Sequence, residues 1–159
     1  MPIHPQTRIG HVHLTVSDLD RAVAFYRDVL GFEVTTTYGR DAVFLSAGGY
    51  HHHIGLNTWA GRGAPAPARG TTGLYHFAIL FPDRKSLATT VRRALDAGVR
   101  LEGASDHGVS EAIYLRDPDG NGLELYRDRP ESEWPKGPDG RLAMSTQPLD
   151  LEKLLSENE

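Results

Sequence analysis

The sequence predicts an α+β domain of two βαβββ modules, each a strand, a helix and three further strands. Three observations lead to this fold: two segments repeat the same order of patterns, each contains a helical apolar stripe, and alternating runs separated by glycine-rich turns follow each stripe. With 159 residues the chain can bury one sizeable core. The expected boundaries are a domain at 8–127, modules at about 8–60 and 74–127, a loop at 61–73 and a C-terminal tail at 128–159.

The first module opens with an alternating strand at 9–16. Ser17 and Asp18 then provide a helix cap, and apolar residues recur at helical spacing until Gly31 ends the helix. The stripe consists of Ala22, Phe25, Tyr26, Val29 and Leu30. Strand periodicity returns at 33–38, 42–46 and 51–58.

The second module repeats this order. A strand at 74–81 leads to Pro82 and Asp83, which begin a helix that Gly98 ends. Its apolar face carries Leu87, Val91, Ala94 and Leu95. Strands follow at about 100–103, 111–116 and 123–126, and a strong turn signal, Asp-Pro-Asp-Gly-Asn-Gly at 117–122, precedes the last of them. The tail is expected to pack on the surface or on a partner.

Composition excludes several classes of protein. The formal charge of −4 gives no basic surface for nucleic acid. The absence of cysteine excludes disulfides, thiolate catalysis and cysteine-ligated zinc. No apolar run resembles a signal peptide or could span a membrane, so we expect a cytoplasmic protein that binds neither nucleic acid nor membrane.

Paired βαβββ modules resemble the vicinal oxygen chelate superfamily of glyoxalases, extradiol dioxygenases and antibiotic-resistance proteins, and the resemblance spans about residues 8–126. It implies curved mixed sheets around one central metal, with ligands on the first strand of each module and the last strand of the second. Those positions hold His11, His76 and Glu124. Glu124 faces the interior if Leu123 and Leu125 point to the other side of the strand.

The segment from His107 to Glu124 is similar to the signature of extradiol, catechol 2,3-dioxygenase-type enzymes. His107, five residues, Ile113-Tyr114, two residues, Asp117-Pro118 and the final Glu124 follow that spacing, with Ser105 as the single departure. The resemblance implies that His107 and Tyr114 hold an ionised substrate hydroxyl. It also implies that His53 is the acid–base catalyst beside O₂.

The residue at position 55 distinguishes a glyoxalase-type lyase from an extradiol dioxygenase. Glyoxalase-type lyases of the superfamily use a fourth ligand at the position of Gly55, and glycine supplies none. Two imidazoles and one carboxylate leave positions open for substrate and O₂, as in non-haem Fe(II) enzymes. His13 is expected to line the pocket or to support a ligand, or else simply to pack. Alternation turns His52 away from the site and puts His51 at its entrance.

The resemblance therefore implies an extradiol dioxygenase that uses Fe(II), or alternatively Mn(II) or another divalent metal, with a catechol-type aromatic diol and O₂. Two alternatives stay open. One is a glyoxalase-like metal-dependent lyase, isomerase or thiol transferase, and the other is a metal-free protein that binds a small molecule such as an antibiotic. The tail and the pairing of modules in the superfamily suggest a homodimer.

Overall fold

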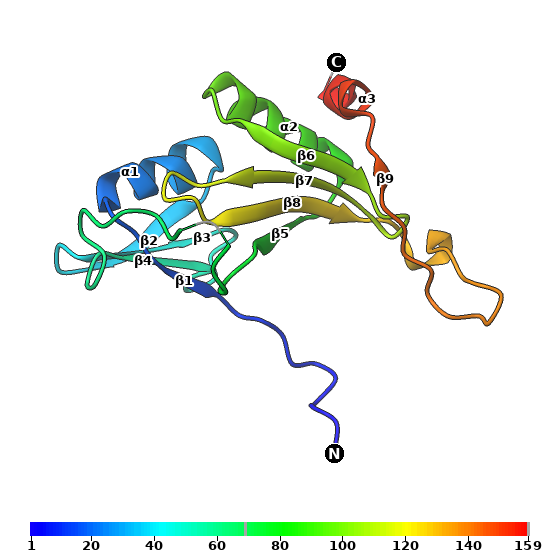
Figure 1. The fold of residues 1–159 in the computed structure, drawn as a ribbon, viewed down its shortest axis with the longest axis horizontal. Coiled ribbons are helices and arrows are strands. Elements are labelled where there is room, and N and C mark those ends of the chain that lie inside the picture. The colour runs from blue at the N-terminus through cyan, green and yellow to red at the C-terminus, as the bar shows by residue number, and fades with distance from the viewer. Residues whose placement is uncertain (69, 159) are drawn as a thin grey trace. The chain divides into compact units, whose positions relative to one another are not determined.

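The computed structural model describes residues 1–68 and 70–158, so Arg69 of the predicted loop and Glu159 lie outside the described residues. The chain divides into two compact units, Met1–Ala66 and Pro67–Glu159. Each unit contains a strand, a helix and three further strands in that order (Figure 1). The predicted α+β fold of two βαβββ modules is confirmed.

The first unit holds one four-stranded sheet, ordered β1-β4-β3-β2. β1 and β4 are parallel, and the other neighbours are antiparallel. The elements are β1 (Val12–Thr15), α1 (Leu19–Ala24), the π-helical turn η1 (Phe25–Val29), β2 (Glu33–Tyr38), β3 (Ala42–Ser46) and β4 (Ile54–Asn57). β4 is shorter than the predicted strand, because residues 51–53 lie outside the regular ladder.

The first helix begins where the sequence predicts, at the Asp18 cap, whose side chain accepts a hydrogen bond of 3.0 Å from the Arg21 backbone N–H. Its second half differs from the prediction. The Leu30 N–H donates to the Phe25 carbonyl at 3.1 Å, a π-helical bond that widens the last turn. The apolar stripe is nonetheless buried, and Tyr26 has no exposed surface.

The second unit holds a five-stranded sheet, ordered β5-β8-β7-β6-β9. β5 and β8 are parallel, and the remaining neighbours are antiparallel. Its main elements are β5 (Phe77–Phe81), α2 (Arg84–Asp96), β6 (Leu101–Asp106), β7 (Ser110–Arg116) and β8 (Gly122–Asp128).

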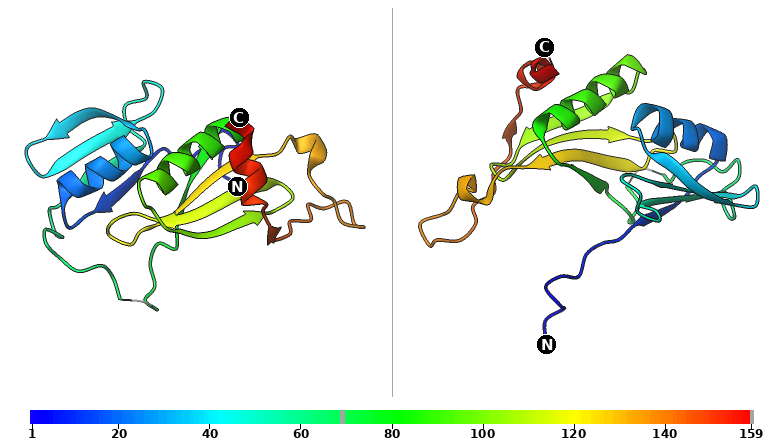
Figure 2. Two further views of the ribbon diagram at one scale, coloured as in Figure 1. Left: turned by 90° about the horizontal axis from the view of Figure 1, so that it is seen from above. Right: turned by 180° about the vertical axis from the view of Figure 1, so that it is seen from behind.

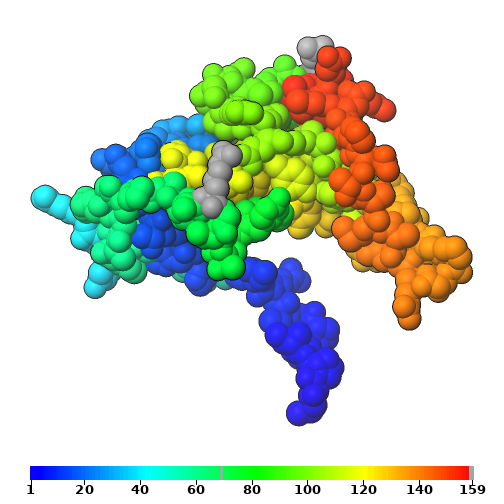
Figure 3. Space-filling view, in the orientation of Figure 1, coloured from blue at the N-terminus to red at the C-terminus, as the bar shows by residue number. Residues whose placement is uncertain are grey.

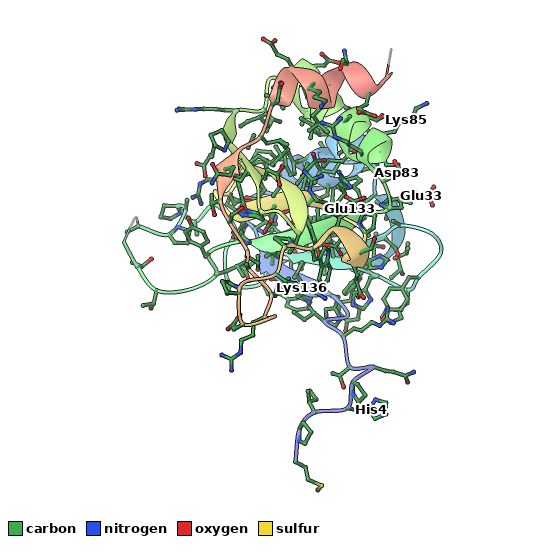
Figure 4. The ribbon with its side chains drawn as sticks, turned by 90° about the vertical axis from the view of Figure 1, so that its right-hand side faces the viewer. His4, Glu33, Asp83, Lys85, Glu133 and Lys136 are labelled. Atoms are coloured by element: carbon green, nitrogen blue, oxygen red, sulfur yellow. The ribbon has the colours of Figure 1, made fainter. Side chains whose placement is uncertain are left out.

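Helix α2 covers one face of the second sheet (Figure 2). Asp83, labelled in Figure 4, caps the helix, since its side chain accepts the Ser86 backbone N–H at 2.7 Å. That bond lowers the pKa of Asp83. Leu87, Val91 and Ala94 are fully buried as predicted, whereas Leu95, one residue before the helix ends, is exposed.

The two units also correspond residue by residue in the pairing of their strands. In the first unit β1 pairs with β4 so that Val12 faces Ile54, and in the second β5 pairs with β8 so that Phe77 faces Leu123. Moving one residue along each pair makes Gly55 the counterpart of Glu124. The β2–β3 and β6–β7 pairs carry a register shift at matching places as well.

The C-terminal segment packs on its own unit. Its elements are η2 (Glu131–Glu133), β9 (Gln147–Pro148), α3 (Leu151–Leu155) and η3 (Ser156–Asn158). α3 lies beside α2 (Figure 3), and its Leu154 is fully buried. Among the described residues, every helix is too short or too polar to cross a membrane.

Glu111 is the centre of a buried charge network. Its carboxylate, in a side chain only 6% exposed, lies 3.0 Å from Arg84 Nε, 2.9 Å from Arg127 Nε and 3.2 Å from Arg129 Nη2. Replacing Glu111 with Gln leaves these partly buried guanidinium groups without their anion. We expect the free energy of unfolding to fall by about 3 kcal/mol.

Urea unfolding of Glu111→Gln measures this loss. Glu102→Gln is the matched control, because Glu102 and its partner Arg116 are each about half exposed. The control should lose less than about 1 kcal/mol. Equal losses for the two variants would show that the network contributes no more than a surface pair.

Candidate functional site

Tyr114 and Glu124 face each other across the β7–β8 pair. Their side chains project to one face of the sheet, with Tyr114 Oη 3.4 Å from Glu124 Oε1. Leu123 and Leu125 alternate with Glu124 and are buried. The predicted orientation of Glu124, opposite to its two leucine neighbours, is confirmed.

His76 lies immediately before β5, the strand parallel to β8. Its Nε2 is 3.0 Å from Glu124 Oε2, and the two side chains are 29% and 14% exposed. The imidazole and the carboxylate therefore converge at one point on the sheet.

The donor atoms of this pair suit a divalent metal. Two ligand atoms that bind one ion at right angles, each about 2.1 Å away, lie about 3.0 Å apart. The His76–Glu124 separation equals this spacing, and imidazole with carboxylate is a set that Fe(II), Mn(II) and Zn(II) accept. In residues 1–68 and 70–158 no three His, Asp or Glu side chains lie close enough together to hold a metal ion. The second unit thus brings together two of the three predicted ligands, His76 and Glu124.

His107 occupies the turn between β6 and β7, where its backbone N–H donates to the Ser110 carbonyl at 2.9 Å. Its ring reaches toward Tyr114, with Nε2 2.8 Å from Oη. Its other nitrogen, Nδ1, lies 2.9 Å from the Ser145 carbonyl of the C-terminal segment. His107, Tyr114, Glu124 and His76 thus form one continuous chain of polar contacts.

A cavity of about 350 Å³ opens over His76, His107 and Tyr114, three of these four side chains. Its lining combines them with residues from β6, β7, β8 and the C-terminal segment. The lining residues are Tyr75, His76, Glu102, Ser105, His107, Tyr114, Leu115, Arg116, Gly122, Leu123 and Thr146. This volume is within the range of small-molecule sites in proteins.

Burial, together with the nearby Glu124 carboxylate, raises the pKa of Tyr114 to about 12. The phenol therefore keeps its proton throughout the neutral range. Tyr114 can act in this cavity as a hydrogen-bond donor, or as an acceptor through its remaining lone pairs.

Gly122 keeps His76 in its place. A Cβ at residue 122 would lie 2.2 Å from the Tyr75 carbonyl oxygen and 3.1 Å from the His76 Cβ. Two atoms cannot lie that close together, so the methyl group added by Gly122→Ala must push residues 75 and 76 away from β8. We expect a loss of about 1–3 kcal/mol of folding free energy and weaker binding of divalent metal.

Calorimetric titration of Gly122→Ala with Zn²⁺ checks this expectation. Gly103→Ala serves as the control, because its added Cβ would meet only the Tyr114 ring, at an ordinary 3.7 Å. If Gly122→Ala matched the wild-type protein in both stability and Zn²⁺ affinity, the close approach would have no part in positioning His76.

The first unit gathers histidines around His11, which lies immediately before β1 just as His76 precedes β5. The rings of His11 and His52 are 4.5 Å apart, and His51 Nδ1 lies 2.8 Å from His52 Nδ1. Burial lowers the pKa of His52, and the neighbouring histidines, His11 first among them, lower it further. The sequence predicted that His52 turns away from the site, but its ring lies beside that of His11, because the regular β4 ladder begins only at Ile54.

His53 is held by two groups of the β3 end. Its Nδ1 accepts a hydrogen bond of 3.3 Å from the Ala47 backbone N–H and lies 3.0 Å from Ser46 Oγ. A backbone N–H can only donate, so Nδ1 carries no proton and the neutral ring carries it on Nε2. His53 is thus a hydrogen-bond donor through Nε2.

His13 fills the space above Gly55. A Cβ at residue 55 would lie 2.9 Å from the His13 Cγ, and the His13 ring packs 5.7 Å from Phe44 and 5.6 Å from Trp59. In the second unit the counterpart of His13 is the small Ala78, which leaves room for Glu124. At these corresponding positions the first unit has a glycine and an imidazole, and the second has a carboxylate and a methyl group.

The predicted site residues divide between the two units. The second unit brings together His76, His107, Tyr114 and Glu124, and the first contains His11 and His53. Two residues of the site, Ser145 and Thr146, were not predicted; they reach it from the C-terminal segment. No local pattern marks them, because their contact with His107 crosses 38 residues or more.

Comparison with known proteins places this geometry in context. Residues 8–125 match the family described as the glyoxalase/bleomycin resistance protein/dioxygenase superfamily. The chain is 44% identical over 155 residues to the catechol-2,3-dioxygenase of Bacillus subtilis (strain 168), covering 98% of this chain and 53% of that protein. It is 35% identical over 122 residues to biphenyl-2,3-diol 1,2-dioxygenase 3 of Rhodococcus globerulus, covering 76% of this chain and 63% of that protein.

Among solved structures, the fold is similar to a crystal structure of lactoylglutathione lyase from Agrobacterium tumefaciens. The TM-score is 0.58 with 28% sequence identity, over 78% of this chain and 96% of that one. The chain spans about half the length of the Bacillus subtilis protein and less than two thirds of the Rhodococcus globerulus one.

Proposed function

Because the chain belongs to the glyoxalase/bleomycin resistance protein/dioxygenase superfamily, we propose that it is an extradiol dioxygenase that opens a catechol-type aromatic diol with O₂ and Fe(II). The observation that carries the proposal is the polar chain from His76 through Glu124 and Tyr114 to His107 around one cavity. The relatives named as catechol and biphenyl-diol dioxygenases support the same reaction.

His11, His76 and Glu124 are the proposed metal ligands. His76 and Glu124 already have the spacing of two ligands of one ion, and His11 has the place in its module that His76 has in the other. A bound Fe(II) would bring diol and O₂ together and carry charge between them, and Mn(II) would suit the same ligands.

Tyr114 and His107 are the groups proposed to hold the diol. The Tyr114 hydroxyl is protonated at neutral pH and can donate to an ionised substrate oxygen. His107 Nε2, 2.8 Å from that hydroxyl, can accept from a substrate hydroxyl that still carries its proton. The two side chains together distinguish the two oxygens of an aromatic diol.

His53 is the proposed acid–base catalyst on the O₂ side. Its Nδ1 is occupied by the Ala47 N–H and Ser46, so Nε2 is the nitrogen that delivers a proton. An imidazole that carries its proton on Nε2 can give that proton and recover it within one turnover.

A metal-dependent lyase or isomerase is the second candidate, supported by the similarity to lactoylglutathione lyase. Gly55 argues against it, because the position equivalent to Glu124 holds no ligand and the His13 ring occupies the space. A metal-free binding protein is disfavoured because the chain keeps all three residues of the proposed ligand set, His11, His76 and Glu124.

Anaerobic loading with Fe(II), followed by catechol and O₂, tests the proposed function. We expect O₂ uptake in equal amount with the diol, and a yellow ring-opened product. Loading with Mn(II) in parallel identifies the metal that supports turnover. Turnover of methylglyoxal with glutathione, and none of any aromatic diol, would assign the chain to the lyases instead.

The same preparations give the oligomeric state. We infer a homodimer from the pairing of modules in the superfamily, and light scattering coupled to size-exclusion chromatography should give about twice the 17.5 kDa of one chain. A measured mass of one chain would contradict the inferred homodimer, and it would leave the proposed reaction unaffected.

A further inference from the structure

Residues 134–158 of the C-terminal segment include β9, which lies along the β6 edge of the second sheet (Figure 1). β9 pairs with the end of β6, with Asp106 facing Gln147. The Leu149 N–H donates to the Ala104 carbonyl at 3.2 Å, and Thr146 lines the cavity. A segment remote in the sequence thus forms part of the site wall.

Both ends of this segment are fixed to the same unit. At its start, Trp134 Nε1 donates to the Arg129 carbonyl at 2.8 Å. At its end, Leu154 is fully buried against α2, and the Arg92 guanidinium donates to the Leu155 carbonyl. The residues between these anchors therefore have a defined position beside His107.

Ser145 and His107 are joined by two reciprocal contacts. The Ser145 N–H donates to the His107 carbonyl at 3.1 Å, and the Ser145 carbonyl lies 2.9 Å from His107 Nδ1. A carbonyl oxygen can only accept, so this second contact requires a proton on Nδ1. The Thr146 hydroxyl is more distant, at 3.4 Å from the same nitrogen.

We propose that the Ser145 backbone carbonyl fixes His107 in the tautomer protonated on Nδ1, so that Nε2 faces the cavity as a hydrogen-bond acceptor. Ser145 is then a positioning residue for the diol, an inference that rests on the proposed function. Without substrate, Nε2 lies 2.8 Å from Tyr114 Oη, and in this tautomer the Tyr114 proton is donated to Nε2 in place of Glu124 Oε1, which is more distant at 3.4 Å. With substrate, the same lone pair is available to a protonated diol hydroxyl.

The two histidines assigned to the reaction would then have opposite tautomers. His53 receives the Ala47 N–H at Nδ1 and keeps its proton on Nε2, whereas His107 donates from Nδ1 and leaves Nε2 bare. One histidine presents a donor and the other an acceptor, each set by a backbone group of its own unit. Backbone groups do not titrate, so the assignment holds across the pH range in which both rings are neutral.

The test is the ¹⁵N chemical shifts of the imidazole nitrogens in protein labelled with [¹⁵N]histidine, recorded at pH 8 without metal and with Zn²⁺. His107→Gln and His53→Phe assign the two rings by the signals they remove. In the wild-type protein we expect a protonated Nδ1 and bare Nε2 for His107, and the reverse for His53.

Two substitutions of Ser145 distinguish the effect of its backbone carbonyl from that of its side chain. Ser145→Ala keeps both backbone contacts and should leave the tautomer unchanged. Ser145→Pro removes the N–H that binds the His107 carbonyl, and so should shift the carbonyl and allow protonated Nε2 to appear. We expect kcat/KM for the diol to fall on the order of 10- to 100-fold. Thermal unfolding of both variants shows whether the fold is kept.

A bare Nδ1, or protons on both nitrogens, in wild-type His107 would overturn the inference. So would Ser145→Pro with an unchanged tautomer. The chemical shifts are read without turnover, so a protein that opens no diol would defeat the proposed function while leaving this inference standing. If Ser145→Pro unfolds, the wild-type and Ser145→Ala spectra still decide the tautomer.

Discussion

Replacing His53 with Phe should lower kcat for ring opening by about 10²- to 10⁴-fold and leave metal binding unchanged. The phenyl ring keeps the bulk beside Tyr50, whose ring centroid lies 4.8 Å from that of His53, but it cannot carry a proton. Because His53 is not a proposed ligand, Fe(II) should still bind. The loss should therefore appear in kcat, after substrate and metal are in place.

Stopped-flow kinetics with Fe(II)-loaded protein measures this loss. His4→Phe is the matched control, since His4 lies in the exposed N-terminal segment and takes the same substitution (Figure 4). His52→Phe is the more informative comparison, because the His52 ring lies beside that of His11, with the two ring centroids 4.5 Å apart. If His52→Phe abolished turnover while His53→Phe did not, the acid–base role would belong to His52.

Removing any one proposed ligand should abolish activity and weaken Fe(II) binding by at least about a hundredfold, because losing a partner outside the ligand shell alone costs up to about that much. Replacing His76 or Glu124 with Ala breaks the pair whose donor atoms lie 3.0 Å apart. His11→Ala removes the ligand that the repeat predicts in the first unit. The three variants should therefore behave alike, although their residues belong to different units.

Anaerobic Fe(II) titration gives the affinities directly. Glu133→Ala, which removes an exposed carboxylate, controls for the loss of one negative charge and should bind Fe(II) as the wild-type protein does. Full affinity in His11→Ala, combined with lost affinity in His76→Ala and Glu124→Ala, would mean that another side chain supplies the third ligand. His52, beside His11, would be the first to examine.

Much of the fold was predictable because it repeats. Local signals bound the elements well: the Asp18 and Asp83 caps begin both helices, and the turn at 117–122 separates β7 from β8. The alternation around Glu124 also follows from the sequence, since Leu123 and Leu125 are buried on the opposite face. These features depend on neighbours within a few residues, which periodicity detects.

The errors arise where regular structure stops. His52 departs from alternation because residues 51–53 precede the β4 ladder, and the π-helical turn at the end of the first helix shares its apolar spacing with an α-helix. The contact made by Ser145 could not be predicted, since it uses a backbone carbonyl, which every type of residue has. Its role depends on how the C-terminal segment folds back on β6.

A single turnover with ¹⁸O₂ tests the central claim most directly. The Fe(II)-loaded protein is mixed with catechol and ¹⁸O₂, and the product is analysed by mass spectrometry. The proposed extradiol dioxygenase predicts that both labelled atoms enter one ring-opened molecule, with the ring cleaved beside the two hydroxyl-bearing carbons. A product without ¹⁸O, or a ring opened between those two carbons, would contradict the proposed function.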